Sequence, residues 1–271
     1  MTLAIGVIDS GVGGLTVAHE IMRCLPNEKV IYVGDSLRCP YGPRPAEEVK
    51  AFTKEMVAFL MAKHIKLLVV ACNTATAFTL KELQTELPIP VIGVVAPGAK
   101  AAIEATSSRA IGVIGTQGTI ASGAYNRAIN DLHKGINIAS LACPDFVPLV
   151  ERGETNSTEA YAVVEATLSP FITQHAIDTL ILGCTHYPLL KDTIQQVVGE
   201  HIKLVSSDKE ITREVRELLT SRQQFNSAAR VEPHEFYFTG DIEAFKSTYK
   251  RIFGEHQLPE DKIKVATAVL S

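Results

Sequence analysis

The sequence predicts an α/β protein of two pseudo-symmetric, doubly wound lobes, each built on a mostly parallel sheet, with the active site in the cleft between them. Two observations predict this fold. Short β-branched apolar runs alternate with longer helical stretches, which is typical of parallel sheets covered by helices on both faces. The alternating pattern also occurs twice along the 271-residue chain, with similar motifs in the same order.

Eight apolar runs have the length and composition of strands, and most are separated by enough chain for a helix. In chain order they are Ile5–Ile8, Val30–Val33, Leu67–Ala71, Val91–Val95, Ile111–Ile114, Thr179–Leu182, Lys203–Val205 and Phe236–Phe238. Apolar residues recur at helical spacing within Glu210–Leu219, and Ile242–Phe253 is expected to form a further helix near the C-terminus.

The internal repeat indicates a duplicated domain. The stretch AIGVIDSG, which begins at Ala4, matches AIGVIGTQG, which begins at Ala110, and the strand before Cys72 matches the strand before Cys184. A third echo pairs VIGVVAP with LVSSD, which begins at Leu204. The repeat distance of about 110 residues is longer than a solenoid repeat, so each copy is expected to be a lobe of its own.

The order of the repeats predicts where the chain passes between the lobes. We expect lobe one to comprise residues 1–96 and 208–271, and lobe two to comprise residues 97–207, with crossings near Pro97 and Ser207. Open parallel sheets bind ligands beyond the carboxyl ends of their strands. Two facing lobes would therefore share one site in the cleft.

Composition excludes several broad classes. The formal net charge is −4, the pI is about 6.1 and no basic stripe occurs, so binding to nucleic acid or to an anionic membrane is not expected. No apolar run reaches the roughly 18 residues of a transmembrane helix, and residues 1–6 lack the basic start of a signal peptide. We therefore expect a cytoplasmic protein with five free thiols. Their spacing predicts no metal site.

Two of the five cysteines, Cys72 and Cys184, occupy matching places at strand-to-helix junctions. The polar residues that follow them are Asn73, Thr74, Thr185 and His186. Amide groups at a helix N-terminus favour a thiolate. Free cysteines are often buried as small apolar residues, but two in duplicated polar contexts favour function. Cys24 and Cys143 are expected to be packing residues, and Cys39 is expected to be a loop residue near the site.

A glycine-rich turn, DSGVGG, follows the first predicted strand and begins at Asp9. Its glycines let backbone N–H groups point toward an anion. The spacing fits neither G-x-G-x-x-G nor G-x-x-x-x-G-K-[ST], so it does not favour a phosphate. A carboxylate bound by Ser10 and the backbone is one interpretation, and a plain tight turn is the other. Asp9 is placed to orient an ammonium group or to act as a base.

Further candidates lie in the loops of both lobes. The stretch that runs from Gly34 to Gly42 and includes Pro40 is expected to be a rigid loop, in which Tyr41 is a candidate to cap a ligand; a purely structural loop is the alternative. The lobe-two counterpart of DSGVGG is GTQGT, which supplies hydroxyls and amides but no charge. Glu151 is a candidate carboxylate near the cleft, although its sequence context is that of a surface residue.

Two cysteines on facing lobes would hold a small ligand between two thiols. This arrangement suits removal of a proton from one face of a carbon and return of a proton to the other face, with a thiolate as the base and a thiol as the acid. Two alternatives remain open. One is a two-lobed protein that binds a small amino acid without chemistry, and the other is a single-cysteine hydrolase or decarboxylase in which Cys184 only packs.

The motifs DSGVGGLTV, GDSLRCPYG, ACNTATA and GCTHYPLL together resemble those of glutamate racemase, the cofactor-independent two-cysteine type of the aspartate/glutamate racemase family. The resemblance covers nearly the whole chain. It implies an isomerase that interconverts L- and D-glutamate without pyridoxal phosphate or another cofactor, supplies D-glutamate for peptidoglycan synthesis, and forms a homodimer. Aspartate racemase or another member of the same fold family is the alternative.

The resemblance also implies roles for individual residues. Cys72 would remove the α-proton of D-glutamate with help from Asp9. Cys184 would remove that of L-glutamate with help from His186, and Glu151 matches an acid near this second thiol. The residues implied to bind the substrate carboxylates and ammonium are Asp9, Ser10, Tyr41, Gly42, Asn73, Thr74, Thr119, Thr185 and His186.

Overall fold

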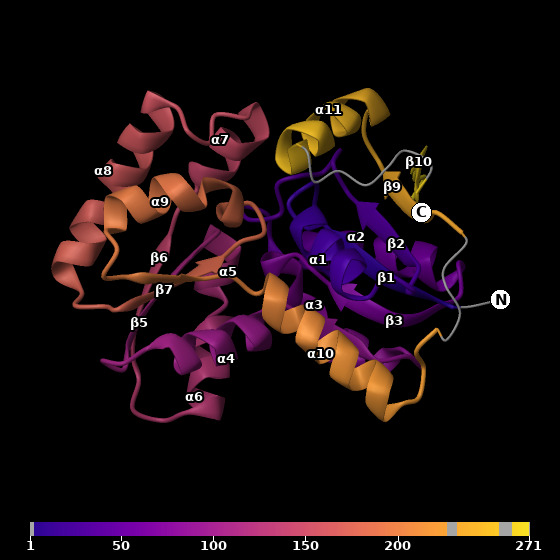
Figure 1. Cartoon of the computed structure of the whole chain (residues 1–271), viewed down its shortest axis with the longest axis horizontal. Helices are drawn as coiled ribbons and strands as arrows, with labels where there is room; N and C mark the ends of the chain where they lie inside the picture. Colours follow the sequence, from indigo (N-terminus) through magenta and orange to yellow (C-terminus); the bar gives the residue numbers. More distant parts are fainter. Residues whose placement is uncertain (1–2, 227–231, 255–261, 271) are drawn as a thin grey trace.

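A computed structural model describes residues 3–226, 232–254 and 262–270, and it shows two sheets side by side, each covered by helices (Figure 1). The six-stranded sheet has the strand order β10-β9-β2-β1-β3-β4, and the four-stranded sheet has the order β6-β5-β7-β8. Every strand pair among the described residues is parallel. The predicted α/β class with two doubly wound lobes is confirmed.

The six-stranded sheet forms the core of lobe one. Its strands are β1 (Ala4–Asp9), β2 (Val30–Gly34), β3 (Ile65–Val70), β4 (Val91–Gly93), β9 (His234–Phe238) and β10 (Ile263–Thr267). Apolar side chains alternate between its two faces and meet different helices on each. One face packs on α1 (Leu15–Cys24), α10 (Asp208–Ser221) and α11 (Ile242–Phe253), and the other on α2 (Ala46–Met61) and α3 (Asn73–Glu86).

Lobe two repeats this plan on a smaller sheet. Its strands are β5 (Ala110–Gly115), β6 (Asn137–Ala142), β7 (Thr179–Gly183) and β8 (Lys203–Val205). One face packs on α7 (Phe146–Arg152), α8 (Thr158–Gln174), the 3-10 helix η1 (Tyr187–Leu190) and α9 (Lys191–Val198), and the other on α4 (Val95–Ala105) and α6 (Ala124–Leu132). The short α5 (Gln117–Ala121) follows β5. Among the described residues, no helix has both the length and the apolar character needed to cross a bilayer.

The structure corrects three details of the predicted elements. The strand expected over Val91–Val95 ends at Gly93, because α4 begins at Val95. Pro97 lies in the first turn of that helix, where its missing N–H leaves no hydrogen bond unmade. The sequence analysis also missed β6 and β10, which are edge strands with partly exposed residues and therefore no continuous apolar run.

A buried ion pair fastens lobe one at the end opposite the cysteines. Lys66 Nζ lies 2.6 Å from a carboxylate oxygen of Glu28, and the two side chains are only 4% and 1% exposed. The same ammonium group donates to the carbonyl oxygen of Gln224, and the backbone and side chain of Asn226 donate to the Glu28 carboxylate. The pair thus connects β3, the turn before β2 and the segment that follows α10.

Lys66→Met is expected to lower the free energy of unfolding by about 3–5 kcal/mol, because Glu28 would stay buried without its cation. Lys54→Met is the matched control, since Lys54 pairs with Glu82 on the surface and its loss should change little. Urea unfolding followed by circular dichroism measures both variants. Equal, small losses would show that the buried pair contributes no more than the exposed one.

Candidate active site

The structure brings Cys72 and Cys184 to one cavity at the junction of the lobes. Cys72 follows β3 and is the N-cap residue of α3, whereas Cys184 directly follows β7. Both therefore lie at the carboxyl ends of central strands, where open parallel sheets bind ligands. Their exposures are 5% and 6%, so each sulfur is withdrawn from bulk water.

The cavity wall consists mainly of polar side chains from both lobes. Its lining residues are Ser10, Pro40, Tyr41, Gly42, Cys72, Asn73, Thr74, Thr116, Val147, Cys184, Thr185 and His186. The space has room for little more than a water molecule. An adjoining cavity of about 180 Å³ shares Pro40, Gly42, Thr116 and Val147 with it.

Cys72 lies in surroundings that keep its thiol neutral. The backbone N–H of Ala75 donates to Cys72 Sγ at 3.5 Å, and Ser10 Oγ lies 3.7 Å from the same sulfur. These contacts favour a thiolate, but burial and then the nearby charge of Asp9 outweigh them and raise the pKa of Cys72 to about 12. Cys72 is therefore protonated at neutral pH.

Cys184 has a different neighbour. Its Sγ lies 3.8 Å from Nδ1 of His186, and Nε2 of the same ring lies 2.6 Å from Oε1 of Glu151. Burial lowers the pKa of His186, but the contacts with Cys184 and Glu151 outweigh burial and raise it well above its ordinary value. The protonated form of the ring is therefore favoured, and it lies between the Cys184 sulfur and the Glu151 carboxylate.

Asp9 joins the two lobes behind the cavity. It is fully buried at the end of β1, where Oδ2 accepts the N–H of Gly11 at 3.0 Å and Oδ1 accepts the hydroxyl of Thr185, from lobe two, at 3.3 Å. Burial raises the pKa of this carboxyl, while the charge of His186 and the hydrogen bonds oppose the rise. Asp9 therefore interacts electrostatically with Cys72 and with His186, the neighbour of Cys184.

Hydroxyl groups make a second bridge between the lobes. Thr74 Oγ1 lies 2.8 Å from Oγ1 of Thr116 and 3.2 Å from Oγ1 of Thr119. The hydroxyl of Tyr125, on α6, donates to Oδ1 of Asn73 at 2.7 Å and so fixes the orientation of that amide. The sequence analysis included Thr116 in the candidate stretch GTQGT but gave it no role of its own, although the internal repeat aligns it with Ser10. Tyr125 was missed, because no sequence pattern marks it.

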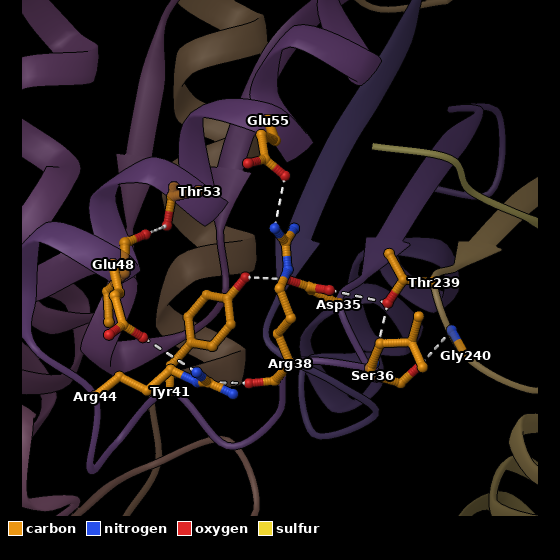
Figure 2. A network of polar contacts seen from close by, with 12 residues as sticks. Asp35, Ser36, Arg38, Tyr41, Arg44, Glu48, Thr53, Glu55, Thr239 and Gly240 are labelled. Atoms are coloured by element: carbon orange, nitrogen blue, oxygen red, sulfur yellow. Dashed lines mark hydrogen bonds and ion pairs between the residues drawn. The ribbon is translucent and has the colours of Figure 1, made fainter. Parts of the chain in front are cut away.

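Figure 2 shows that a buried carboxylate organises the loop after β2. Asp35 accepts hydrogen bonds from Nε of Arg38 at 2.6 Å, from the hydroxyl of Tyr41, and from Oγ1 of Thr239 at 2.9 Å. The Tyr41 ring is buried and packs on Phe52. The side chain is held within lobe one but also lines the cavity, so its expected contact with a ligand stays a prediction.

The next residue in the loop contacts lobe two directly. The carbonyl oxygen of Gly42 accepts the N–H of Gly118 at 2.9 Å. A Cβ on Gly42 would lie 2.5 Å from Cβ of Thr116, so this close approach requires glycine. The Asp35 network thus places Gly42 against the opposite lobe at the edge of the cavity.

The three remaining cysteines lie where the sequence predicts. Cys143 is buried in the core of lobe two, and Cys24 packs against the core of lobe one, half-buried on α1 beside Glu20. Cys39 is in the loop next to Gly11, near the cavity. Burial, followed by the charges of Glu151 and Asp9, raises the pKa of Cys39.

Residues 5–214 match the family described as Asp/Glu/Hydantoin racemase. The chain belongs to this family. Its matched region includes both cysteines and every other residue predicted for the site. The predicted family is therefore confirmed.

Individual relatives extend the likeness to almost the full chain. A glutamate racemase of Oceanobacillus iheyensis is 57% identical over 98% of this chain and 97% of its own length. The crystal structure of a glutamate racemase isoform from Bacillus anthracis has a TM-score of 0.93 and 45% identity, with 99% of this chain and 98% of that chain covered. A Francisella tularensis glutamate racemase solved with D-glutamate has a TM-score of 0.88 and 31% identity, with 98% and 97% covered.

The contrast between the sulfurs predicts an order of chemical modification. Iodoacetamide at neutral pH is expected to alkylate Cys184 before Cys72, because burial and Asp9 raise the pKa of Cys72 and the thiolate is the form of cysteine that reacts. Peptide mass mapping of time points measures the two rates. The control is His186→Asn, which removes the cation and should slow the alkylation of Cys184. Faster labelling of Cys72 in the unaltered protein would contradict the assignment of charge.

Proposed function

We propose that the protein is a glutamate racemase that moves protons at the α-carbon with two cysteines. The observation that carries this proposal is the placement of Cys72 and Cys184, one from each lobe, on one cavity in contrasting electrostatic surroundings. Family membership supports racemisation. The names of the relatives, and the D-glutamate bound in one related structure, support glutamate as the substrate.

The charges assign the first proton transfer for each isomer. With L-glutamate bound, the thiolate of Cys184 removes the α-proton, an S–H bond forms, and the electron pair of the broken C–H bond stays on the substrate. Cys72 then donates its proton to the opposite face, which gives D-glutamate and a Cys72 thiolate. D-glutamate reacts in the reverse sense, with Cys72 as the base.

The groups around the two sulfurs fit the rest of the substrate. Ser10, Asn73, Thr74 and Thr185 offer hydroxyl and amide donors for two carboxylates, and Asp9 offers a negative charge for the ammonium group. Three other expected binding residues are proposed to support the site through their neighbours. Tyr41 and Gly42 hold the loop after β2 in place, and Thr119 contacts the hydroxyl of Thr74.

His186 and Glu151 act as a unit with Cys184. The imidazolium favours the Cys184 thiolate, and the Glu151 carboxylate favours the imidazolium. Asp9 has the opposite effect on Cys72, since its negative charge opposes a second negative charge nearby. In this arrangement one sulfur begins as the base and the other as the acid.

Substrate entry is proposed to require the lobes to move apart, because the inner cavity is too small for an amino acid. Lobe one would be residues 1–96 and 208–271, and lobe two residues 97–207. The passages between β4 and α4 and between β8 and α10 connect the two sheets, so they are the proposed hinge.

The proposed setting is cytoplasmic synthesis of D-glutamate for peptidoglycan by a homodimer, as the resemblance implies. The reaction as proposed needs neither pyridoxal phosphate nor a metal, because the two thiols supply both proton transfers. Exchange of the α-hydrogen of L-glutamate in D₂O, followed by nuclear magnetic resonance with no added cofactor, tests the function directly. Binding of glutamate without exchange would instead indicate the two-lobed binding protein.

Single substitutions separate the two sulfurs. Cys72→Ser or Cys184→Ser is expected to lower racemisation about 10²–10⁴-fold, because each turnover needs an acid and a base. Elimination from glutamate with chloride on the β-carbon needs only the base. Cys184→Ser should therefore retain elimination from the D-isomer, and Cys72→Ser should retain it from the L-isomer. Circular dichroism and release of chloride measure the two reactions.

Cys24→Ser is the control for these variants, since Cys24 lies on α1 away from the cavity lining and should leave both reactions unchanged. Full racemisation by either site variant would indicate the single-cysteine alternative. Loss of elimination from both isomers in both variants would show that the assignment of each base is wrong.

Glu151→Gln is expected to move the alkaline limb of the pH profile of kcat/KM to lower pH. The Glu151 carboxylate raises the pKa of His186, so its removal lets the imidazolium lose its proton earlier as the pH rises. Both directions should shift together, because enantiomers have equal free energies. Glu154→Gln, which removes an exposed partner of Arg152, is the control. An unmoved alkaline limb would show that Glu151 does not act through His186.

A further inference from the structure

Cys39, Glu151 and His186 form a cluster that the proposed proton transfers do not fully explain. Their sulfur, oxygen and nitrogen atoms all lie within 4.8 Å of one another. The three residues come from distant parts of the sequence: the loop after β2, helix α7 and the turn after β7. Sequence spacing therefore predicted no metal site, although the fold assembles these three side chains.

The cluster has the chemistry of a zinc site. Thiolate, imidazole and carboxylate are the ligands that Zn²⁺ takes in proteins, and three protein ligands with an open fourth position are typical of accessible sites. Tetrahedral zinc holds its donor atoms about 3.3–3.6 Å apart. His186 Nε2 and Glu151 Oε1 are 2.6 Å apart, so they need to separate slightly when the metal binds, and the Glu151 side chain is 39% exposed.

The local backbone allows the donors to converge. A Cβ on Gly11 would lie 3.1 Å from Cys39 Sγ and 3.8 Å from Glu151 Oε1. Both donors therefore pack over the place where another residue would carry its side chain. Cys39 belongs to lobe one, whereas Glu151 and His186 belong to lobe two, so a metal on all three would connect the lobes.

We propose that Cys39, Glu151 and His186 form an inhibitory site for Zn²⁺ across the mouth of the cleft. On binding, the Cys39 thiol and the Nε2 of His186 each release one proton to solvent, and bonds to the metal replace those N–H and S–H bonds without any change of oxidation state. The Nδ1–H of His186 still faces Cys184, but the metal takes the place of the Nε2 contact with Glu151 and holds the ring and that carboxylate in position. The link between lobes also opposes the separation that substrate entry requires.

Metal binding is tested first without any assay of activity. The protein, freed of metal with a chelator, is titrated with Co²⁺, which gives a sulfur-to-cobalt absorption band when a thiolate is bound. The band is expected in the unaltered protein and in Cys24→Ser, and it is expected to be lost in Cys39→Ser and Cys39→Ala. No band, or a band that persists without Cys39, would overturn the site.

Inhibition is tested next with buffered free Zn²⁺ in a racemisation assay, and only this arm rests on the proposed function. Zinc should inhibit the unaltered protein and Cys24→Ser, and a chelator should restore activity. Cys39→Ser should keep its activity without zinc and require at least about 10-fold more zinc for the same inhibition. Equal inhibition of Cys39→Ser would place the metal on other thiols and overturn the proposal. Absence of racemisation in every sample would reject the proposed function but leave the cobalt result standing.

Discussion

The buried carboxylate of Asp9 is the constraint around which both lobes are arranged. It terminates the central strand β1, is fully buried, and accepts hydrogen bonds from Gly11 in its own lobe and from Thr185 in the other. A Cβ on Gly14 would lie 2.5 Å from Cβ of Asp9, so the turn that follows can approach the carboxylate only as glycine. A charge withdrawn from water must be solvated by the protein. Here the hydrogen bonds to Asp9 come from both lobes, at the place where the lobes meet.

The same constraint explains why the cavity is polar and closed. Hydroxyls of Thr74, Thr116 and Thr119 bridge the lobes, and Gly42, in the loop that the Asp35 network holds, contacts Gly118 of lobe two. Each contact joins the carboxyl ends of strands in two different sheets. These contacts require the lobes to be close, so the polar wall of the cavity is made by both lobes together.

Sequence patterns could predict the central strands and the paired cysteines because both have local signatures. A strand buried on two faces is a continuous apolar run, and Cys72 and Cys184 each sit among polar residues after such a run. The edge strands β6 and β10 lack that signature, since their residues are partly exposed. The contact of Tyr125 with Asn73 arises only when the lobes pack against each other. The residues next to Tyr125 in the sequence therefore give no sign of it.

The duplicated lobes place the two cysteines in similar positions, but the charged groups near each cysteine differ. A racemase needs two groups of one kind on opposite faces of a carbon, yet at the start of a turnover one must be ionised and the other protonated. In this chain Asp9 opposes ionisation of Cys72, whereas His186, held by Glu151, stands as a cation beside Cys184. In the proposed mechanism, one proton carried across the substrate reverses the charges of both sulfurs, and the opposite reaction begins from the state that the first one leaves behind.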